Sequence, residues 1–252
     1  MNTQNLVTYC EQLKLMVFYK ELAQQLKMGK LSTEDSIEQS LLTQVNFNHD
    51  VKIQRLLKQA KLREPKADIG ELTFKYWSKL NKAEVSRHFD CQWIKQRLNI
   101  TAIGPTGSGK TYIACALAKQ AIFQGIPVLF LRFIDLVLQL SAAEKNETLY
   151  AFRRKLSRYP LIVVDDWAIK ALSDSQRHLL FEFIEERDEK ASLLITSQYE
   201  VDEWHRAFGE QIMADSVLDR ISNHSHFFNM SCDISLREVF GLNFKGGSHV
   251  KP

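Results

Sequence analysis

The sequence predicts an α/β fold, in which a five-stranded and mostly parallel sheet is flanked by helices, together with a small N-terminal helical domain. Short apolar runs rich in β-branched residues alternate with longer amphipathic segments, and this alternation is typical of β-α-β units. The expected strands lie at 100–103, 128–131, 161–164, 193–196 and 226–229, and the expected helices between them at 111–124, 134–158 and 173–190.

The composition is that of an ordinary soluble globular protein. The 252 residues are 45% hydrophobic and 25% charged, which is enough to form one α/β core and a smaller appendage. The four cysteines are widely spaced, and neither a secretory signal nor an apolar stretch of the roughly twenty residues that cross a bilayer is present. We therefore expect a cytoplasmic protein with reduced thiols and no membrane partner. The net charge of +3 is too small to indicate a nucleic-acid partner alone.

The part of the chain before the sheet is expected to be helical. Apolar residues recur at helical spacing over 6–17, and a second helix begins at Ser32 and ends before Pro65. The segment 63–70 is the best linker candidate because Pro65 and Gly70 both break helices. The expected domains are a helical domain over 1–68 and the α/β core over 69–252, with a disordered tail from about 245.

The strongest motif is a phosphate-binding loop that follows the first expected strand. The sequence GPTGSGKT at 104–111 matches the pattern G-x-x-x-x-G-K-[ST], in which glycines let successive backbone N–H groups point at one anion. The expected phosphate-binding residues are Gly104, Pro105, Thr106, Gly107, Ser108, Gly109, Lys110 and Thr111. A glycine-rich turn with a chance lysine is the alternative, but a strand before the loop and a helix after it favour a nucleoside triphosphate site.

Two aspartates follow the third expected strand. A buried parallel strand that ends in a carboxylate places it at the edge of the sheet where ligands of such folds bind. We expect Asp165 to hold Mg²⁺ together with Thr111, and Asp166 to act as the base that orients the attacking water. The alternative is an apolar strand that ends in a polar turn.

Polar residues further along the chain could complete the site. Thr196 or Gln198, after the fourth strand, could hydrogen-bond phosphate or water, or could be an ordinary polar strand exit. Arg220 could reach into the site of a neighbouring subunit or form a salt bridge with the preceding turn. Arg237 could touch phosphate in its own subunit or cap a helix.

Two basic clusters are candidate DNA contacts. The first contains Lys52, Arg55 and Lys58, and the second contains Arg153, Arg154, Lys155 and Arg158. Cations at this density can neutralise phosphates, which would make binding sensitive to salt. A solvated helix face is the alternative for each cluster.

The motifs together resemble the IstB family, AAA+ ATPases that help transposition and are related to the DnaC helicase loaders. The resemblance rests on GPTGSGKT at 104–111, LIVVDDW at 161–167, ITSQ at 195–198, the pair Glu203-Trp204 and the stretch 215–220. It implies that Lys110 and Thr111 are Walker A residues and that Asp165 and Asp166 are Walker B residues. It also implies that Gln198 lies at sensor 1, that Arg220 is an arginine finger acting in trans, and that Arg237 is similar to sensor 2.

The resemblance also implies a role for the chain. Such a protein binds ATP and Mg²⁺, assembles on duplex DNA as a homo-oligomer with its ATP sites at subunit interfaces, and recruits a transposase. The region 132–158 would face the DNA backbone, which adds Arg132 and Lys145 to the candidate contacts. The alternatives are a replicative helicase loader and, from a different class, a small-molecule kinase. Asp166 and Gln198 replace the Glu and Asn usual in relatives, and we expect these replacements to slow hydrolysis.

Overall fold

The structure is a computed structural model, and it describes residues 3–209, 211–232 and 235–236. It contains two compact units, Met1–Arg55 and Leu56–Pro252. This division falls earlier in the chain than the domain boundary expected near residue 68, which stays a prediction. Arg237 and the tail expected to be disordered lie outside the described residues.

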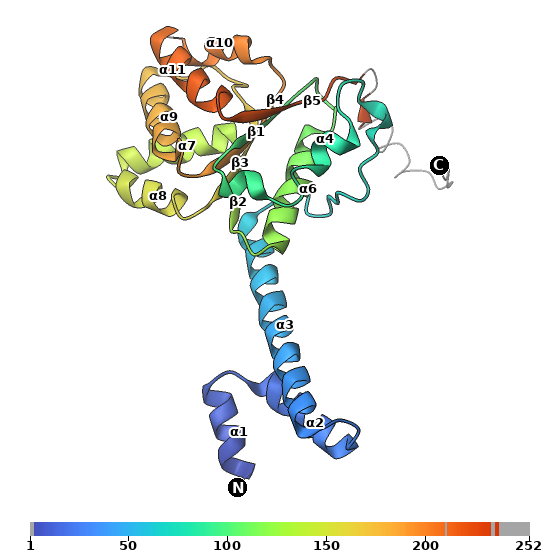
Figure 1. Cartoon of the computed structure of the whole chain (residues 1–252). Coiled ribbons are helices and arrows are strands. Elements are labelled where there is room, and N and C mark those ends of the chain that lie inside the picture. Colours follow the sequence, from blue (N-terminus) through green and yellow to red (C-terminus); the bar gives the residue numbers. More distant parts are fainter. Residues whose placement is uncertain (1–2, 210, 233–234, 237–252) are drawn as a thin grey trace, which may run out of the picture. The chain divides into compact units, whose positions relative to one another are not determined.

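The first unit is helical, as the sequence predicts. Its helices are α1 (Thr3–Gln12), α2 (Met16–Met28) and α3 (Thr33–Ala60), of which α3 continues into the second unit (Figure 1). Lys14 separates α1 from α2 because its left-handed backbone, with φ of 58°, cannot continue a helix. The predicted start of the long helix is confirmed, since the amide of Asp35 donates to Ser32 Oγ at 3.1 Å.

The second unit is built on five parallel strands, as predicted. They are β1 (Asn99–Ile103), β2 (Val128–Arg132), β3 (Leu161–Trp167), β4 (Ser192–Ser197) and β5 (Ser225–Asn229). Their order in the sheet is β2-β3-β4-β1-β5, and every neighbouring pair is parallel. Because all carboxyl ends meet at one edge, the loops after β1, β3 and β4 lie side by side there.

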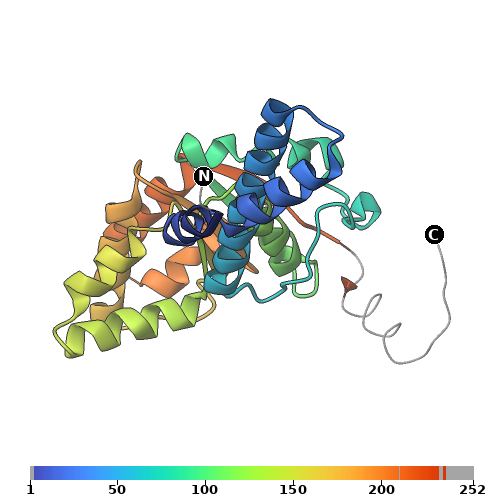
Figure 2. The same ribbon diagram turned by 90° about the horizontal axis from the view of Figure 1, so that it is seen from below.

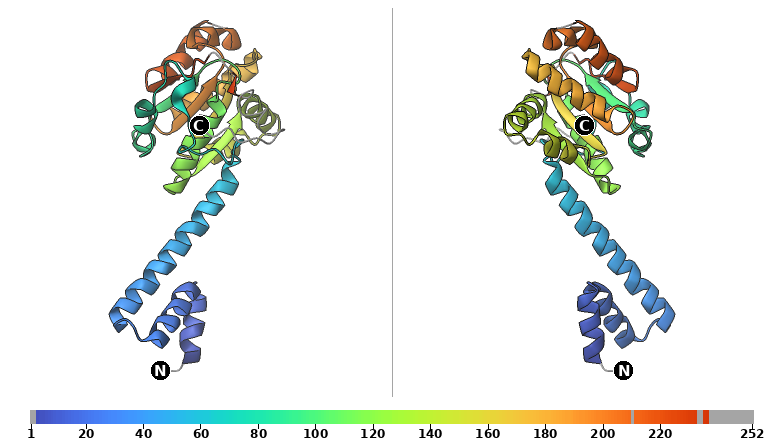
Figure 3. Two further views of the ribbon diagram at one scale, coloured as in Figure 1. Left: turned by 90° about the vertical axis from the view of Figure 1, so that its right-hand side faces the viewer. Right: turned by 90° about the vertical axis from the view of Figure 1, so that its left-hand side faces the viewer.

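Helices cover both faces of this sheet. The longer ones are α6 (Lys110–Phe123), α7 (Phe133–Lys145), α8 (Leu149–Leu156), α9 (Asp174–Arg187) and α11 (Gln211–Ser222), and the shorter ones are α4 (Lys82–Ser86), α5 (Gln92–Lys95), α10 (His205–Phe208) and the 3₁₀ turns η1 (Phe74–Tyr76) and η2 (Val201–Trp204). Helix α6 covers one face, and α7 and α9 cover the other (Figures 2 and 3). Side chains of β3 alternate between the two layers, so that Ile162 and Val164 pack with α7 and α9.

One predicted helix is wrong in its extent. The segment 134–158 forms two helices, α7 and α8, instead of one. The reason is local, because Glu147 adopts a left-handed backbone with φ of 57° and interrupts the helical hydrogen bonding. The break starts a new helix at Leu149. This helix and the turn after it carry the second basic cluster, of which Arg153 contacts α9.

Candidate nucleotide-binding site

The predicted site residues meet at the carboxyl edge of the sheet. The phosphate loop follows β1, Asp165 and Asp166 end β3, and Gln198 follows β4. Since β1 and β3 are both neighbours of β4, these three groups converge on one place. The order of the strands along the chain does not determine their order in the sheet, so the sequence alone could not establish which of these groups are neighbours.

The backbone of the phosphate loop needs its glycines. Gly107 and Gly109 have φ values of 83° and 88°, a region that residues with a side chain rarely adopt. A side chain at Gly104 would place its Cβ 2.7 Å from the carbonyl oxygen of Met230. These positions therefore require glycine for conformational and steric reasons, independently of any ligand.

Lys110 is held in place by the loop that it follows. Its side chain is buried, and Nζ donates to the carbonyl oxygens of Gly104 at 2.7 Å and Pro105 at 2.8 Å. A buried ammonium group is stable only when it is paired or hydrogen-bonded, and the loop carbonyls supply those acceptors. The cation is thus positioned where an anion bound in the loop would meet it.

Two residues outside the motif enclose the loop. Trp77 Nε1 donates to the carbonyl oxygen of Ser108 at 2.7 Å, and the amide of Leu236 donates to the carbonyl oxygen of Gly107 at 2.9 Å. Trp77 is buried, with 7% of its surface exposed. Sequence reasoning did not identify Trp77, because no motif or spacing in the chain relates it to the phosphate loop.

Asp165 is the most buried carboxylate of the site. Its side chain is fully buried, and Oδ1 accepts hydrogen bonds from Thr111 Oγ1 at 2.9 Å and Thr196 Oγ1 at 2.6 Å. A hydroxyl and a carboxylate at this distance are the oxygen ligands that Mg²⁺ uses in triphosphate sites, so the pair fits the predicted metal. Thr196, which the sequence offered as a phosphate or water ligand, contacts this carboxylate.

Asp166 lies on a bulge at the end of β3. The register with β4 shifts between Val164 and Trp167, and Asp166 has a left-handed φ of 59°. In a regular strand its side chain would point to the face opposite that of Asp165. The bulge instead brings both carboxylates to one place, and Thr196 Oγ1 accepts the Asp166 amide at 3.1 Å.

Gln198 connects the third strand to the phosphate loop. Its Nε2 donates to Asp166 Oδ1 at 3.4 Å, and its Oε1 accepts from Thr106 Oγ1 at 2.6 Å. The side chain therefore lies between the loop that binds phosphate and the predicted base. The role expected of Gln198 at sensor 1 stays a prediction.

Arg63 is a second residue of the site that sequence reasoning missed. Its Nη1 lies 2.9 Å from Asp165 Oδ2 and 3.5 Å from Asp166 Oδ2. The hydrogen bond to Asp165 raises the pKa of the guanidinium above its ordinary value. Arg63 was assigned to a linker because Pro65 and Gly70 follow it, and no spacing in the chain relates it to a strand 102 residues away.

Arg220 lies on α11 and faces α9. Its guanidinium is 3.4 Å from Glu185 Oε1 and 3.8 Å from Asp188 Oδ2, lies over the ring of Phe181, and donates to the backbone of Ser216. Among the described residues, none of these partners belongs to the nucleotide site of the same chain. The alternative partner Asp215 pairs with His205 at 3.6 Å.

The predicted DNA contacts fall into two groups. Arg153 is engaged by Glu182 and Glu186 of α9, and Arg132 by Asp135 at 2.8 Å and 2.9 Å. The other predicted contacts are exposed: Lys52, Arg55, Lys58, Lys145, Arg154, Lys155 and Arg158. Arg132 is also exposed, so the structure separates the predicted contacts by pairing: Arg153 and Arg132 are paired with neighbouring acids, and the described residues offer the other cations no acidic partner.

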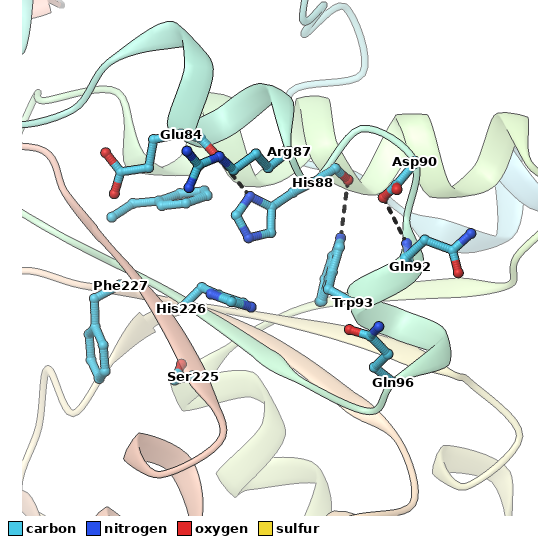
Figure 4. A pocket seen from close by; sticks show the side chains of 11 residues that line it. Glu84, Arg87, His88, Asp90, Gln92, Trp93, Gln96, Ser225, His226 and Phe227 are labelled. Atoms are coloured by element: carbon cyan, nitrogen blue, oxygen red, sulfur yellow. Dashed lines mark hydrogen bonds between the residues drawn. The ribbon is translucent and has the colours of Figure 1, made fainter.

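A cavity of about 420 Å³ lies beside β5, bounded by α4 and α5 (Figure 4). The rings of His88 and His226 meet edge to face there at 4.8 Å, and Trp93 Nε1 donates to the carbonyl oxygen of His88 at 3.2 Å. Burial lowers the pKa of His88, so this imidazole is neutral at pH 7. The lining includes no residue of the phosphate loop or of the ends of β3 and β4, and the cavity is distinct from the nucleotide site.

Comparison with known proteins gives matches over most of the chain. A family model described as IstB-like ATP binding protein matches residues 8–238. A Pseudomonas fluorescens relative, named as an ATP-binding protein of insertion sequence IS1162, is 32% identical over 201 residues, which cover 79% of this chain and 87% of the relative. A Sinorhizobium fredii (strain NBRC 101917 / NGR234) relative, also named as an insertion sequence ATP-binding protein, is 30% identical over 213 residues, covering 84% and 86%.

Solved structures match the fold of the second unit. The DnaC helicase loader has a TM-score of 0.56 at 20% identity and covers 65% of this chain and 96% of its own. The replication initiator DnaA bound to AMPPCP and single-stranded DNA has a TM-score of 0.58 at 16% identity, covering 70% and 53%. At these identities the likeness shows the fold alone, and the predicted α/β core with a five-stranded parallel sheet flanked by helices is confirmed. No helix in the described ranges is long and apolar enough to span a bilayer.

Proposed function

The chain belongs to the IstB-like ATP-binding protein family, and from this premise we propose that it is a DNA-dependent ATPase that assists a transposase. One observation carries the hydrolysis part of the proposal. A continuous set of hydrogen bonds joins Thr111, Asp165, Thr196, Asp166 and Gln198, and returns to the phosphate loop at Thr106. Such a network connects the group that binds phosphate to the group that would activate water.

The proposed chemistry assigns each residue a distinct role. Lys110 neutralises the terminal phosphates, and Asp166 orients the attacking water and takes its proton. Gln198 couples the binding of the terminal phosphate to the position of Asp166, because its side-chain amide contacts both Asp166 and the loop. A carboxylate one methylene shorter than Glu reaches less far toward the water, which supports slow turnover.

Thr111 and Asp165 would hold Mg²⁺, which fits their oxygen ligands and their separation of 2.9 Å. The ion, when bound, supplies positive charge to the phosphate oxygens. Thr196 keeps the Asp165 carboxylate in place through the second hydrogen bond to Oδ1. Together with Thr111, it orients the carboxylate by contacts that come from two different elements.

We also propose that the chain assembles into an oligomer in which Arg220 acts on the site of a neighbouring copy. Its described partners are Glu185, Asp188, Ser216 and Phe181, which lie on α9 and α11 away from the site of its own chain. An arginine placed in this way supports action on the site of a neighbouring copy. Mixing Arg220→Ala chains with Asp166→Asn chains tests this, because a trans finger restores part of the activity only in mixed assemblies.

DNA and transposase partners are proposed from two observations. The relatives at 30–32% identity are named as ATP-binding proteins of insertion sequences, and Arg154 and Lys155 of α8 and Arg158 of the turn after it are exposed. The cations would contact the DNA backbone, so little sequence preference is expected. The likeness to the helicase loader is limited to the fold and does not favour a helicase as partner.

An ATPase assay with and without duplex DNA tests the proposal. We expect Mg²⁺-dependent turnover that duplex DNA increases, and we expect Lys110→Ala and Asp166→Asn to reduce it to background. Turnover that is indifferent to DNA, together with no DNA binding in the presence of ATP, would contradict the proposal and favour a kinase. Copurification with a replicative helicase instead of a transposase would assign the chain to helicase loading.

A further inference from the structure

The carboxylates of Asp165 and Asp166, here named the Walker B pair, already hold a cation from their own chain. Arg63 Nη1 contacts Oδ2 of both residues, at 2.9 Å and 3.5 Å. Oδ1 of Asp165 is taken by Thr111 and Thr196, so the carboxylate of Asp165 has partners at both oxygens. Two adjacent carboxylates repel each other, and the guanidinium relieves that repulsion.

Arg63 is carried by a segment that packs on the helix of the phosphate loop. We name residues 63–71 the strap, because two side chains of α6, Tyr112 and Lys119, fasten it along one side of that helix through three hydrogen bonds. The Tyr112 hydroxyl accepts the amide of Asp68 at 3.2 Å and donates to Glu71 Oε2 at 3.1 Å, and Lys119 Nζ donates to the carbonyl oxygen of Ala67 at 3.1 Å. These are isolated side-chain contacts, and the strap has no helix or strand.

The Arg63 guanidinium can leave without disturbing the core. Its side chain is 43% exposed, whereas that of Asp165 is fully buried. A half-exposed arginine exchanges its partner for water at little cost, while a buried carboxylate that loses a cation needs a replacement. The asymmetry makes Asp165 the fixed partner and Arg63 the one that can be exchanged.

Resting on the proposed function, we propose that Arg63 and Mg²⁺ are alternative occupants of the Walker B pair. A divalent ion held by Thr111 and Asp165 would lie next to the guanidinium, and two cations on one carboxylate repel each other. Binding of the metal with its nucleotide therefore releases Arg63 and loosens the strap from α6. Arg63 sets the Mg²⁺ requirement of the site, and the strap responds to its occupancy.

Equilibrium binding measures this competition without turnover. A fluorescent, non-hydrolysable ATP analogue is titrated onto the full chain at a series of free Mg²⁺ concentrations. In Arg63→Gln we expect the Mg²⁺ concentration at half-saturation to fall about tenfold, the factor of an ordinary charge-assisted hydrogen bond. The Mg²⁺ concentration at half-saturation of Arg63→Lys should lie between those of the wild type and Arg63→Gln, because a lysine keeps the charge and loses the planar geometry. Arg97→Gln is the matched control, since Arg97 donates to the carbonyl oxygen of Glu189 away from the site.

Two outcomes would overturn the inference. An unchanged or higher Mg²⁺ midpoint in Arg63→Gln means that the arginine does not compete with the ion. Weaker analogue binding at saturating Mg²⁺ means that Arg63 binds the triphosphate itself. Thermal unfolding of each variant establishes that the chain is folded, and Arg63→Lys keeps the test valid if Arg63→Gln is unstable.

Hydrogen exchange gives a second readout that a purely structural arginine would not move. Amides of the strap, in particular that of Asp68, should exchange faster in the wild-type chain when Mg²⁺ and the analogue are added, and should already be fast in Arg63→Gln. Increased protection of the strap would overturn the inference. If Lys110→Ala binds the analogue as well as the wild type does, the proposed nucleotide function fails. If Lys110→Ala loses binding and Arg63→Gln binds with an unchanged Mg²⁺ midpoint, this inference alone fails.

Discussion

Two arginines of this chain each hold a pair of carboxylates, and the surroundings of the two pairs differ. Arg63 contacts Asp165 and Asp166 at the carboxyl edge of the sheet, where the Asp165 side chain is fully buried. Arg153 contacts Glu182 and Glu186 on the outer side of α9, where the glutamates are 47% and 45% exposed. The same chemistry therefore occurs once with a fully buried carboxylate and once with two exposed ones.

Burial decides what each cluster can do. Water screens the charges of the α8–α9 cluster, so its ion pairs contribute about 0–1 kcal/mol each. At the Walker B pair, the carboxylate of Asp165 depends on protein donors alone, and losing one of them leaves a buried charge without compensation. The state of the buried cluster thus depends on which cation contacts Asp165, and the exposed cluster only links α8 to α9.

The largest effect is expected from removing the buried charge. Asp165→Asn should reduce the turnover of Mg²⁺–ATP at least about 100-fold, because the site loses a metal ligand and the partner of Arg63. Glu182→Gln removes a carboxylate of the exposed cluster and should leave turnover within about twofold. Steady-state kinetics at saturating ATP measures both variants, and similar losses in the two would break the comparison.

The hydroxyl that supports the buried pair should matter for folding as well. Thr196→Val deletes a donor to Asp165 and an acceptor of the Asp166 amide, and should lower the free energy of unfolding by about 1–3 kcal/mol. Urea denaturation measures it. Thr43→Val, at a half-buried position of α3 whose hydroxyl donates to the carbonyl oxygen of Gln39 at 2.9 Å in a solvent-exposed hydrogen bond, is the matched control and should change the free energy by less than about 0.5 kcal/mol. Equal losses would mean that burial of the hydroxyl is unimportant.

Arg154 of α8 and Arg158 of the turn after it, to which the described residues offer no acidic partner, are expected to bind DNA. Neutralising Arg154 and Arg158 together should weaken duplex binding and reduce the slope of log affinity against log salt by about 2. Fluorescence anisotropy over a range of salt concentrations measures this slope. The single variant Arg153→Gln is the control, and we expect the slope to stay the same because Glu182 and Glu186 already hold Arg153. A smaller slope in that variant would mean that Arg153 also contacts DNA phosphates.

The smallest effect is expected for the stability contribution of the exposed cluster. Arg153→Gln should lower the free energy of unfolding by no more than about 1 kcal/mol, and high salt should reduce the difference between variant and wild type. Denaturation at low and high salt tests this. A larger and salt-independent loss would show that the pair behaves like a buried one.

Much of the nucleotide site could be predicted from single motifs. The phosphate loop and the aspartates after β3 are local patterns, because phosphate chemistry requires those residue types at that spacing. The five strands also followed from apolar runs, which burial on both faces demands. The single helix expected over 134–158 failed because its interruption depends on the backbone of one residue, Glu147, whose side chain carries no strong turn preference.

Contacts between distant segments could not be predicted in this way. Arg63 resembles any surface cation near a proline, and only the packing of the strap on α6 brings it to Asp165. Arg153 belongs to a basic run that resembles a nucleic-acid contact, and only the proximity of α9 provides its two glutamates. In both cases the partner lies on an element that the local sequence does not specify.

The sequence by itself determined the phosphate loop, the carboxylates that follow β3 and the parallel sheet that presents them, because each depends on residues close together in the chain. The tertiary structure alone decided which cation sits on Asp165 and Asp166, and which cations of α8 face solvent. The physical reason is that ion pairing depends on distance and burial, and strands 102 residues from an arginine acquire both only when the chain has folded.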